Sequence, residues 1–221
     1  MILAAGRGER MRPLTDDLPK PLLPVAGRPL IEHQLAALSQ AGLREIVINL
    51  AWRGAMLRAA LGDGARFGVR IEYSDEGEQA LETGGGIFKA LPLLGCEPFL
   101  AVSGDIWSDF PFAASASRLA HGDVAHFVLV PNPDFHARGD FGLHGERVTD
   151  VPGQRHTYAN IGVFRREFFA GCEAGRFPLA PLMFEWARKG RVSGELYAGR
   201  WFNVGSRAQL AELDARLAAG S

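Results

Sequence analysis

MILAAGRGERMRPL, residues 1–14, joins an apolar run to two glycines and three arginines within a few positions. The continuous apolar stretch from Met1 to Ala4 predicts a buried strand. Because this strand is short, we expect further residues upstream of Met1. Gly6 and Gly8 predict a tight turn directly after the strand, where their small size leaves backbone groups accessible.

The glycine loop matches neither of the two common nucleotide-binding loops. Met11 occupies the third glycine position of the GxGxxG dinucleotide fingerprint, and the sequence contains no GxxxxGK[ST] P-loop. An isolated GxG is most often a turn without a ligand. Here, however, Arg7, Arg10 and Arg12 lie in or next to the loop, and Lys20 stands between two prolines. Accessible backbone N–H groups with cations nearby indicate a cradle for a triphosphate.

Alternating strand and helix patterns after the loop predict an α/β fold. The predicted strands are 1–4, 45–50, 69–74, 98–103 and 124–130. The predicted helices run from Pro29 to just before Gly42, over 53–61, from a capping Thr83 through residue 94, and more weakly over 112–120. This order favours a Rossmann-like, mixed but mostly parallel sheet flanked by helices, with ligands at the carboxyl ends of the strands.

Beyond residue 131 the pattern changes to short strands separated by turns, at 141–143, 147–151 and 158–164. These strands predict a small β-rich lobe that covers or binds an acceptor. A helix at 181–189, a strand at 192–197 and a final helix follow, the last capped by Ser206 and Gln209. We expect one domain over 1–221, with parts 1–130, 131–200 and 201–221.

Composition excludes several classes of protein. The 24 basic and 25 acidic residues leave almost no net charge, so we expect neither nucleic acid nor an anionic membrane as a partner. No apolar run approaches the roughly 20 residues of a membrane span. Cys96 and Cys172 lie far apart, which indicates neither a disulfide framework nor a zinc site. A cytoplasmic protein that binds small molecules fits best, and its oligomeric state is left open.

The motifs resemble a known family. LAAGRGERMRPLT (3–15) with PKPLLPVAG (19–27) is similar in order and spacing to the signature of the sugar-1-phosphate nucleotidyltransferases, also called nucleoside-diphosphate-sugar pyrophosphorylases. The resemblance continues through LETGGG (81–86), SGD (103–105) and WFNVG (201–205), so it covers nearly the whole chain. Residues 73–95 and the short length are most similar to the branch that acts on N-acetylmuramate-1-phosphate in peptidoglycan recycling.

The resemblance implies a reaction and assigns roles in it. The phosphate of a sugar-1-phosphate attacks the α-phosphate of a nucleoside triphosphate, in this branch UTP, and pyrophosphate leaves. By resemblance, Arg12 stabilises the leaving pyrophosphate and Lys20 stabilises the α-phosphate and the sugar phosphate. We therefore expect Arg12→Ala or Lys20→Ala to lower turnover by orders of magnitude. The implied nucleotide contacts are Leu3, Ala4, Ala5, Gly6, Arg7, Gly8, Glu76, Glu82, Thr83 and Gly84.

The resemblance also implies a Mg²⁺ cofactor and a sugar site. Asp105 and Asn203 are the implied metal ligands, and Asn203 stands where muramate-type relatives usually carry aspartate. An amide oxygen still binds Mg²⁺, although with one carboxylate fewer. Gly139 and Asn160 match sugar-binding positions, and Arg138 is a candidate for the carboxylate of muramate. On this assignment residues 1–130 bind nucleotide, 131–200 bind sugar, and 201–221 hold the metal-ligand turn and last helix.

Two alternatives remain open. The signature is shared with mannose-1-phosphate guanylyltransferases and glucose-1-phosphate enzymes, so another base or sugar fits the same motifs. A non-catalytic nucleotide-sugar sensor of the same fold is the second alternative. The joint presence of Arg12, Lys20 and Asp105 favours an enzyme over a sensor.

Overall fold

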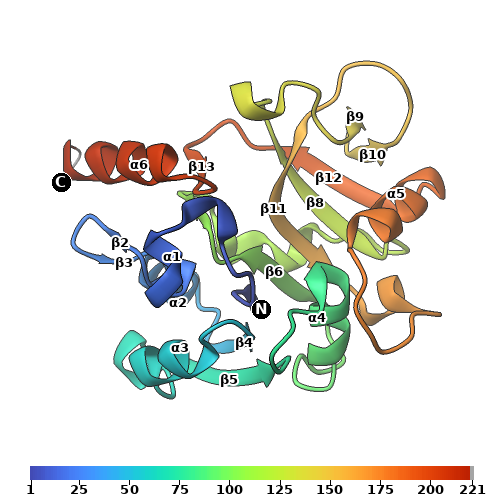
Figure 1. Ribbon diagram of the computed structural model, residues 1–221. Helices are drawn as coiled ribbons and strands as arrows, with labels where there is room; N and C mark the ends of the chain where they lie inside the picture. The colour runs from blue at the N-terminus through green and yellow to red at the C-terminus, as the bar shows by residue number, and fades with distance from the viewer. Residues whose placement is uncertain (220–221) are drawn as a thin grey trace.

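A nine-stranded mixed sheet runs through the residues that the computed structural model describes, 1–219 without the side chain of Ala116 (Figure 1). All of its strands except β10 and β11 point in the same direction. Across the sheet the order is β5 (Arg70–Asp75), β4 (Glu45–Leu50), β1 (Ile2–Leu3), β6 (Phe99–Ser103), β11 (Thr157–Phe164), β8 (Ala125–Val130), β12 (Val192–Leu196), β10 (Arg147–Thr149) and β9 (Gly142–His144).

Helices cover both faces of this sheet. They are α1 (Leu14–Asp17), α2 (Leu30–Gln40), α3 (Gly54–Leu61), α4 (Glu82–Ala90), α5 (Ala180–Arg188) and α6 (Arg207–Ala219). Along β4, Ile46 and Ile48 pack into the core beneath α2 and α3, whereas Val47 packs into the core beneath α4 and α5. Apolar residues on both sides of one strand are typical of a sheet buried between two helical layers. The predicted fold class is therefore confirmed.

Two small antiparallel ribbons lie outside the main sheet. One pairs β2 (Pro24–Val25) with β3 (Arg28–Pro29), and the other pairs β7 (Ile106–Ser108) with β13 (Trp201–Asn203). The second ribbon joins the chain just after β6 to the chain just before α6. It therefore brings two segments that are far apart in sequence to one end of the sheet.

Most predicted elements occur within a residue or two of their expected bounds, but two expectations are wrong. Thr83 is not a helix cap, because α4 begins at Glu82 and Thr83 lies in its first turn. The weak helix expected over 112–120 consists of two short 3₁₀ turns, Phe112–Ala114 and Ala116–Arg118. The hydroxyl of Ser206 does accept from the backbone N–H of Gln209, as expected for the last helix.

Strands from 131–200 belong to the same sheet as those from 1–130. β11 lies between β6 and β8 near the middle of the sheet, and β12, β10 and β9 continue it to one edge. β11 is suited to this place because Ala159, Ile161 and Val163 are buried among the apolar residues of its neighbours. The predicted parts of the chain are thus joined by one continuous sheet.

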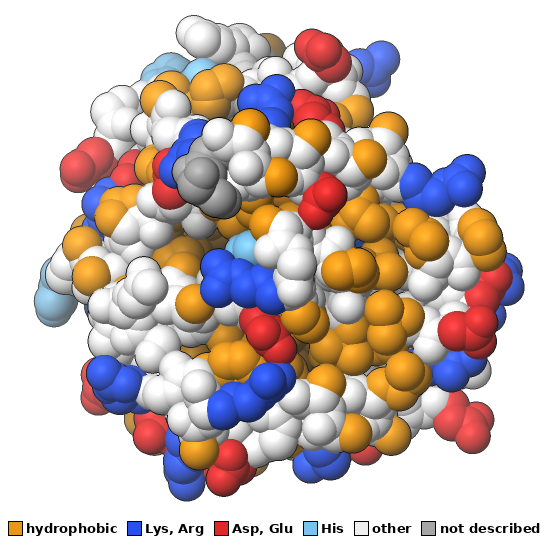
Figure 2. All heavy atoms as spheres, turned by 90° about the vertical axis from the view of Figure 1, so that its left-hand side faces the viewer, with side chains coloured by type: hydrophobic (Ala, Val, Ile, Leu, Met, Phe, Trp, Pro, Cys, Tyr) orange, Lys and Arg blue, Asp and Glu red, His pale blue; other side chains and the backbone are white. Residues whose placement is uncertain are grey.

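The surface that carries α2, α3 and α6 mixes side chains of all types (Figure 2). Hydrophobic side chains gather in its centre and right, while Lys, Arg, Asp and Glu are interspersed around them. No large area of a single charge is seen on this face. Among residues 1–219, no helix is both long and apolar enough to cross a membrane.

Phe168 offers a test of the core beneath α5. Its ring is fully buried and packs against the rings of Phe164, Phe169 and Trp186. We expect Phe168→Ala to lower the free energy of unfolding by about 3–5 kcal/mol, measured by urea denaturation. Phe135→Ala is the control, since its 57 % exposed ring predicts a change below about 0.5 kcal/mol. Equal losses from the two substitutions would contradict this packing.

Candidate active site

Two adjoining hollows lie at the carboxyl ends of the strands. The first, about 830 Å³, is bordered by the loops that follow β1, β5 and β6, and we call it the glycine-loop hollow. The second, about 600 Å³, lies beside β11 and α5, and we call it the β11 hollow. The residues that border both hollows are Leu3, Arg10, Glu82, Thr83 and Ser103. Open α/β sheets bind ligands at this edge, as the sequence predicted.

Gly8 shapes the wall of the glycine-loop hollow. Its φ of +68° is a left-handed conformation, and a Cβ at this position would lie 3.1 Å from the Cβ of Lys20. The hydroxyl of Thr15 donates to the carbonyl of Gly8 at 2.9 Å and fixes the loop from outside. Glycine is favoured here because it has no side chain to clash and adopts positive φ at low cost. The loop and Lys20 can therefore lie in direct contact.

Lys20 lies against the glycine loop, and Pro19 and Pro21 flank it in the chain. It begins a short 3₁₀ turn, Lys20–Leu22, and its side chain is nearly buried. Its Nζ lies 2.6 Å from Oδ2 of Asp105, which follows β6. A buried ammonium needs such a partner, since an unpaired buried charge is strongly destabilising. The structure thus brings the predicted catalytic lysine and a predicted metal ligand together.

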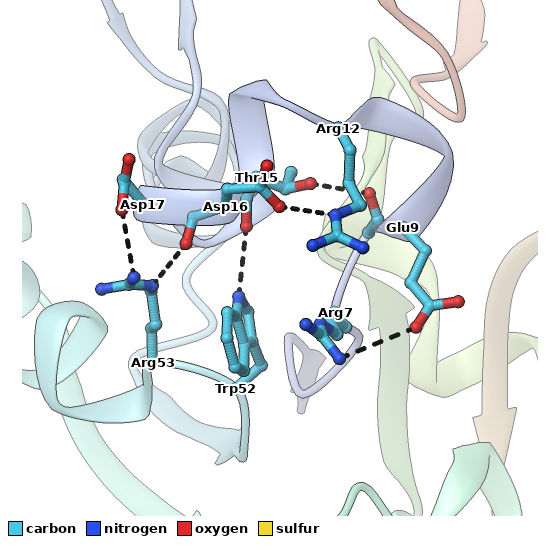
Figure 3. Close-up of polar contacts among 9 residues, drawn as sticks. Arg7, Glu9, Arg12, Thr15, Asp16, Asp17, Trp52 and Arg53 are labelled. Carbon is cyan, nitrogen blue, oxygen red and sulfur yellow. Dashed lines mark hydrogen bonds and ion pairs between the residues drawn. The ribbon is translucent and has the colours of Figure 1, made fainter.

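The three arginines of the opening motif point to different places. Arg10 borders both hollows, and its guanidinium lies against Gly205 at the start of the last helix. Arg7 borders the glycine-loop hollow and stacks over the ring of Trp52, 4.4 Å from its centroid. Arg12 borders neither hollow, and its Nε instead donates to Asp16 at 2.5 Å on the exposed outer side (Figure 3).

The environment of Arg12 is that of a surface ion pair. The hydrogen bond to Asp16, together with the charge of that carboxylate, raises the pKa of Arg12. The neighbouring contacts in Figure 3 tie the same segment down, because Arg53 pairs with Asp17 and the indole N–H of Trp52 donates to the carbonyl of Thr15. Of these two arginines, it is thus Arg10, which the sequence reasoning gave no role, that borders the hollows. Arg12 comes directly after the 3₁₀ turn Glu9–Met11, in which Arg10 lies.

Most of the other predicted nucleotide contacts line the expected hollow. Residues 3–8 all border the glycine-loop hollow, and so does Glu76. Gly84 borders neither hollow, because it packs against Phe177. Gly85 and Gly86 likewise lie close to other parts of the chain, the backbone of Gly175 and the side chain of Glu76. The three consecutive glycines thus permit close packing of α4 against the protein itself.

The ribbon of β7 and β13 places Asn203 next to Asp105. Asn203 pairs with Ile106, and the N–H of Val204 donates to the carbonyl of Asp105 at 2.9 Å. Both side chains supply hard oxygen atoms, which Mg²⁺ prefers. The Oδ1 atom of Asn203 is buried and has no hydrogen-bond partner among the described residues. A buried oxygen acceptor without a hydrogen-bond partner can bind a cation, so the residues present suit a metal ion.

Asp109 fixes the end of this ribbon at which β7 finishes and β13 begins. Its carboxylate accepts from the backbone N–H and the Nε of Arg200, both at 2.8 Å, and from the hydroxyl of Tyr197. Burial, with the adjacent carboxylate of Asp109, raises the pKa of Tyr197 to about 12, so this hydroxyl stays a donor at neutral pH. Among the described residues there is no group of three or more His, Cys, Asp or Glu side chains that could hold a metal ion.

On the other side, Asn160 borders the β11 hollow at an irregularity of the sheet. The register of β11 against β8 shifts between Tyr158 and Gly162, and Asn160 adopts a φ of +57° within this shift. Bulges and left-handed residues of this kind often direct a side chain toward a site.

The two other predicted sugar contacts lie elsewhere. Arg138 is exposed and Gly139 forms a turn against Asn132, and neither borders the hollow. His136 and Asp140, which flank them, border it instead. They bond to each other at 3.0 Å, and Asp140 also accepts from the N–H of Tyr158. The loop spacing contains no signal that would have separated these neighbours.

Known proteins resemble this chain in sequence over most of its length. Residues 1–143 match the family model described as nucleotidyl transferase. The chain is 50% identical to the N-acetylmuramate alpha-1-phosphate uridylyltransferase of Neisseria meningitidis serogroup B, over 97% of this chain and 96% of that protein. It is 37% identical to the protein of the same name from Caulobacter vibrioides, over 99% and 96% of the two chains.

Solved structures share the fold at lower sequence identity. A Bacillus anthracis protein in complex with sucrose superimposes with a TM-score of 0.86 at 20% identity, over 97% of this chain and 93% of its own. A UDP-glucose pyrophosphorylase complexed with UDP-glucose gives 0.79 at 17% identity, over 100% and 98%. These likenesses show the fold, and the family match with the two full-length relatives shows more: the chain belongs to the nucleotidyl transferase family.

Proposed function

We propose that the protein transfers a uridylyl group from UTP to N-acetylmuramate-1-phosphate, forming the UDP-sugar and pyrophosphate with Mg²⁺ as cofactor. The two relatives that carry this activity in their names are similar to the chain over nearly its whole length. The proposal also includes a role for this product in peptidoglycan recycling and a cytoplasmic location for the enzyme.

The observation that carries the proposal is the pair of hollows that meet at Arg10. Backbone groups of the glycine loop and the cation of Lys20 border one hollow, as a triphosphate requires. Polar Asn160 and apolar Met183 and Phe184 border the other, as an acylated sugar requires. A nucleotide in the first and a sugar phosphate in the second would place their reacting groups at the shared wall.

The chemistry needs charge neutralisation more than proton transfer. A phosphate monoester has a second pKa of about 6, so the attacking oxygen is already ionised near neutral pH. Phosphoryl transfer is then catalysed by positioning and by cations that balance the developing charge. Lys20 supplies one such cation in the glycine-loop hollow, and Arg10 supplies a second where the two hollows meet. A bound phosphate would replace Asp105 as the partner of Lys20.

The remaining residues have supporting roles in this proposal. Mg²⁺ bound to Asp105 and Asn203 would supply electrostatic stabilisation of the phosphate oxygens. Leu3 to Gly8 would contact the triphosphate, Glu82 and Thr83 the nucleoside, and Asn160 the sugar. Arg138 and Gly139 lie outside the β11 hollow, so their predicted contacts would need a rearrangement of the loop.

A guanylyltransferase acting on mannose-1-phosphate is the second candidate. The chain is 38% identical to the mannose-1-phosphate guanylyltransferase of Mycobacterium tuberculosis, but over 68% of this chain and 37% of that protein. The match thus covers little more than a third of a longer protein. The full-length match to the uridylyltransferases therefore supports the first candidate more strongly.

Substrate identity is tested by a matrix of nucleoside triphosphates against sugar-1-phosphates, scored by pyrophosphate release with Mg²⁺. We expect the highest kcat/KM for UTP with N-acetylmuramate-1-phosphate. Preference for GTP with mannose-1-phosphate would replace the proposal by the second candidate. Binding of nucleotide without turnover of any pair would identify a sensor instead.

The two arginines are compared by substituting each with alanine. Because Arg10 borders both hollows, we expect Arg10→Ala to lower kcat/KM by about 100-fold or more, as loss of a transition-state cation does. Arg12→Ala should change kcat/KM by less than about 5-fold, since an exposed ion pair contributes little. Lys20→Ala is the positive control. A larger loss from Arg12→Ala than from Arg10→Ala would favour the assignment made from the sequence.

Asn203→Asp tests the metal site. The variant adds a carboxylate where the structure has an unpaired amide oxygen, so we expect activity to persist at a lower Mg²⁺ concentration for half-maximal rate. The measurement is a Mg²⁺ titration of initial rates for both forms. A folded but inactive aspartate variant would count against Asn203 as a ligand.

A further inference from the structure

A buried hydrogen-bond network joins two walls of the glycine-loop hollow, and its side chains, Asn49 and Glu76, border that hollow. We infer that Asn49 and Glu76 are positioning residues, which hold the loop after β1 at a fixed distance from the segment that begins α4. The inference rests on the proposed function, because it concerns how the same nucleotide site is built.

The network consists of three directed hydrogen bonds. The backbone N–H of Ala4 donates to Oδ1 of Asn49 at 2.7 Å. The amide Nδ2 of Asn49 donates to Oε1 of Glu76 at 2.6 Å, and the backbone N–H of Leu81 donates to Oε2 of Glu76 at 2.6 Å. Both polar atoms of the Asn49 side chain and both carboxylate oxygens of Glu76 therefore have a hydrogen-bond partner within the protein.

Both side chains are shielded from water. Asn49 is 3% exposed and Glu76 is 7% exposed. Glu76 is tied to the sheet as well, since its backbone N–H donates to the carbonyl of Leu50 at 2.8 Å. Gly86 makes room for the pair, because a Cβ there would collide with Oε1 of Glu76 and lie 2.9 Å from Nδ2 of Asn49. A glycine of α4 is thus fitted to this network.

The two backbone groups that the network holds belong to opposite sides of the site. Ala4 lies in the glycine loop, whereas Leu81 directly precedes Glu82, which borders both hollows. A shift of either segment would alter the space between the triphosphate and the nucleoside. Because both oxygens of Glu76 are engaged within the chain, its role is to position these segments, in place of the direct nucleotide contact that the sequence suggested.

The directions of the hydrogen bonds permit a test by exchanging donor and acceptor. Glu76→Gln places an NH₂ group against a donor whichever way the amide is turned. Asn49→Asp places a second carboxylate against that of Glu76. In the double variant Asn49→Asp/Glu76→Gln, Asp at 49 can accept from Ala4 and from the Gln amide, whose oxygen accepts from Leu81. All three hydrogen bonds are then restored.

We expect each single variant to raise the KM for UTP about 10-fold, because each leaves a buried polar group unsatisfied. The KM for the sugar phosphate should change by less than about 2-fold, a span too small to indicate a lost hydrogen bond. The double variant should return the KM for UTP to within about 3-fold of the parent, as expected for directly coupled residues. A direct role of Glu76 in reading the base predicts no such rescue.

Glu195→Gln is the matched control. Glu195 is also a hydrogen-bonded glutamate, paired with His126 and Arg118, but it borders neither hollow. Its substitution should leave the KM for UTP unchanged. An equal rise in KM for this control would show a general effect of removing a charge and would overturn the inference.

Measuring the folding and the UTP binding of each variant separately distinguishes the possible outcomes. If the single variants fail to fold but the double variant folds and binds UTP as the parent does, the pairing is confirmed. A folded double variant whose UTP affinity stays impaired overturns it. UTP binding is measured by calorimetry as well as by turnover. An absence of turnover in the parent would therefore reject the proposed function while still leaving the network tested.

Discussion

The ion pair between Lys20 and Asp105 is the interaction on which the rest of the site depends. It joins the 3₁₀ turn Lys20–Leu22 to the segment that follows β6, and the two paired residues are 85 positions apart in the chain. In a largely buried place neither charge is tolerated without the other or without a ligand. Replacement of one partner by phosphate, and of the other by a cation, conserves this balance. In the proposed function, both charges would therefore stay paired when a polyanion and a metal ion bind.

Parallel strands make this pairing possible. β5, β4, β1 and β6 run side by side in one direction, so the loops at their carboxyl ends converge although they come from the whole first half of the chain. Asn49 and Glu76 lie at the ends of β4 and β5, and Asp105, the partner of Lys20, follows the end of β6. The scaffold that buries the core also sets the spacing of the site.

Apolar and periodic residues were sufficient to predict the strands and the general place of the site. Glu45–Leu50 shows why, since its run of β-branched and apolar residues favours a strand over a helix. Side-chain direction within a short turn was not predictable in the same way. Arg10 and Arg12 are only two positions apart, yet Arg10 borders the hollows and Arg12 lies on the surface. The difference depends on the 3₁₀ turn Glu9–Met11, which buries Met11 between them.

Two other expectations could not be settled from the sequence, for a different physical reason. The glycines at 84–86 indicated a close approach, and the structure shows that the approaching groups belong to the chain itself. A single sequence does not distinguish packing against protein from packing against a ligand, because both require the same absence of a side chain. Arg138 was expected at the sugar because of its charge, but the neighbouring His136 and Asp140 border the hollow.

The site is divided into two hollows that meet at Arg10. The decisive test of this division is a crystal structure with a non-hydrolysable UTP analogue and N-acetylmuramate-1-phosphate bound. We expect the triphosphate to lie against residues 3–8, the sugar beside Asn160, and Arg10 within hydrogen-bond distance of a phosphate oxygen. A nucleotide bound in the β11 hollow, or a phosphate held by Arg12 with Arg10 turned away, would contradict it.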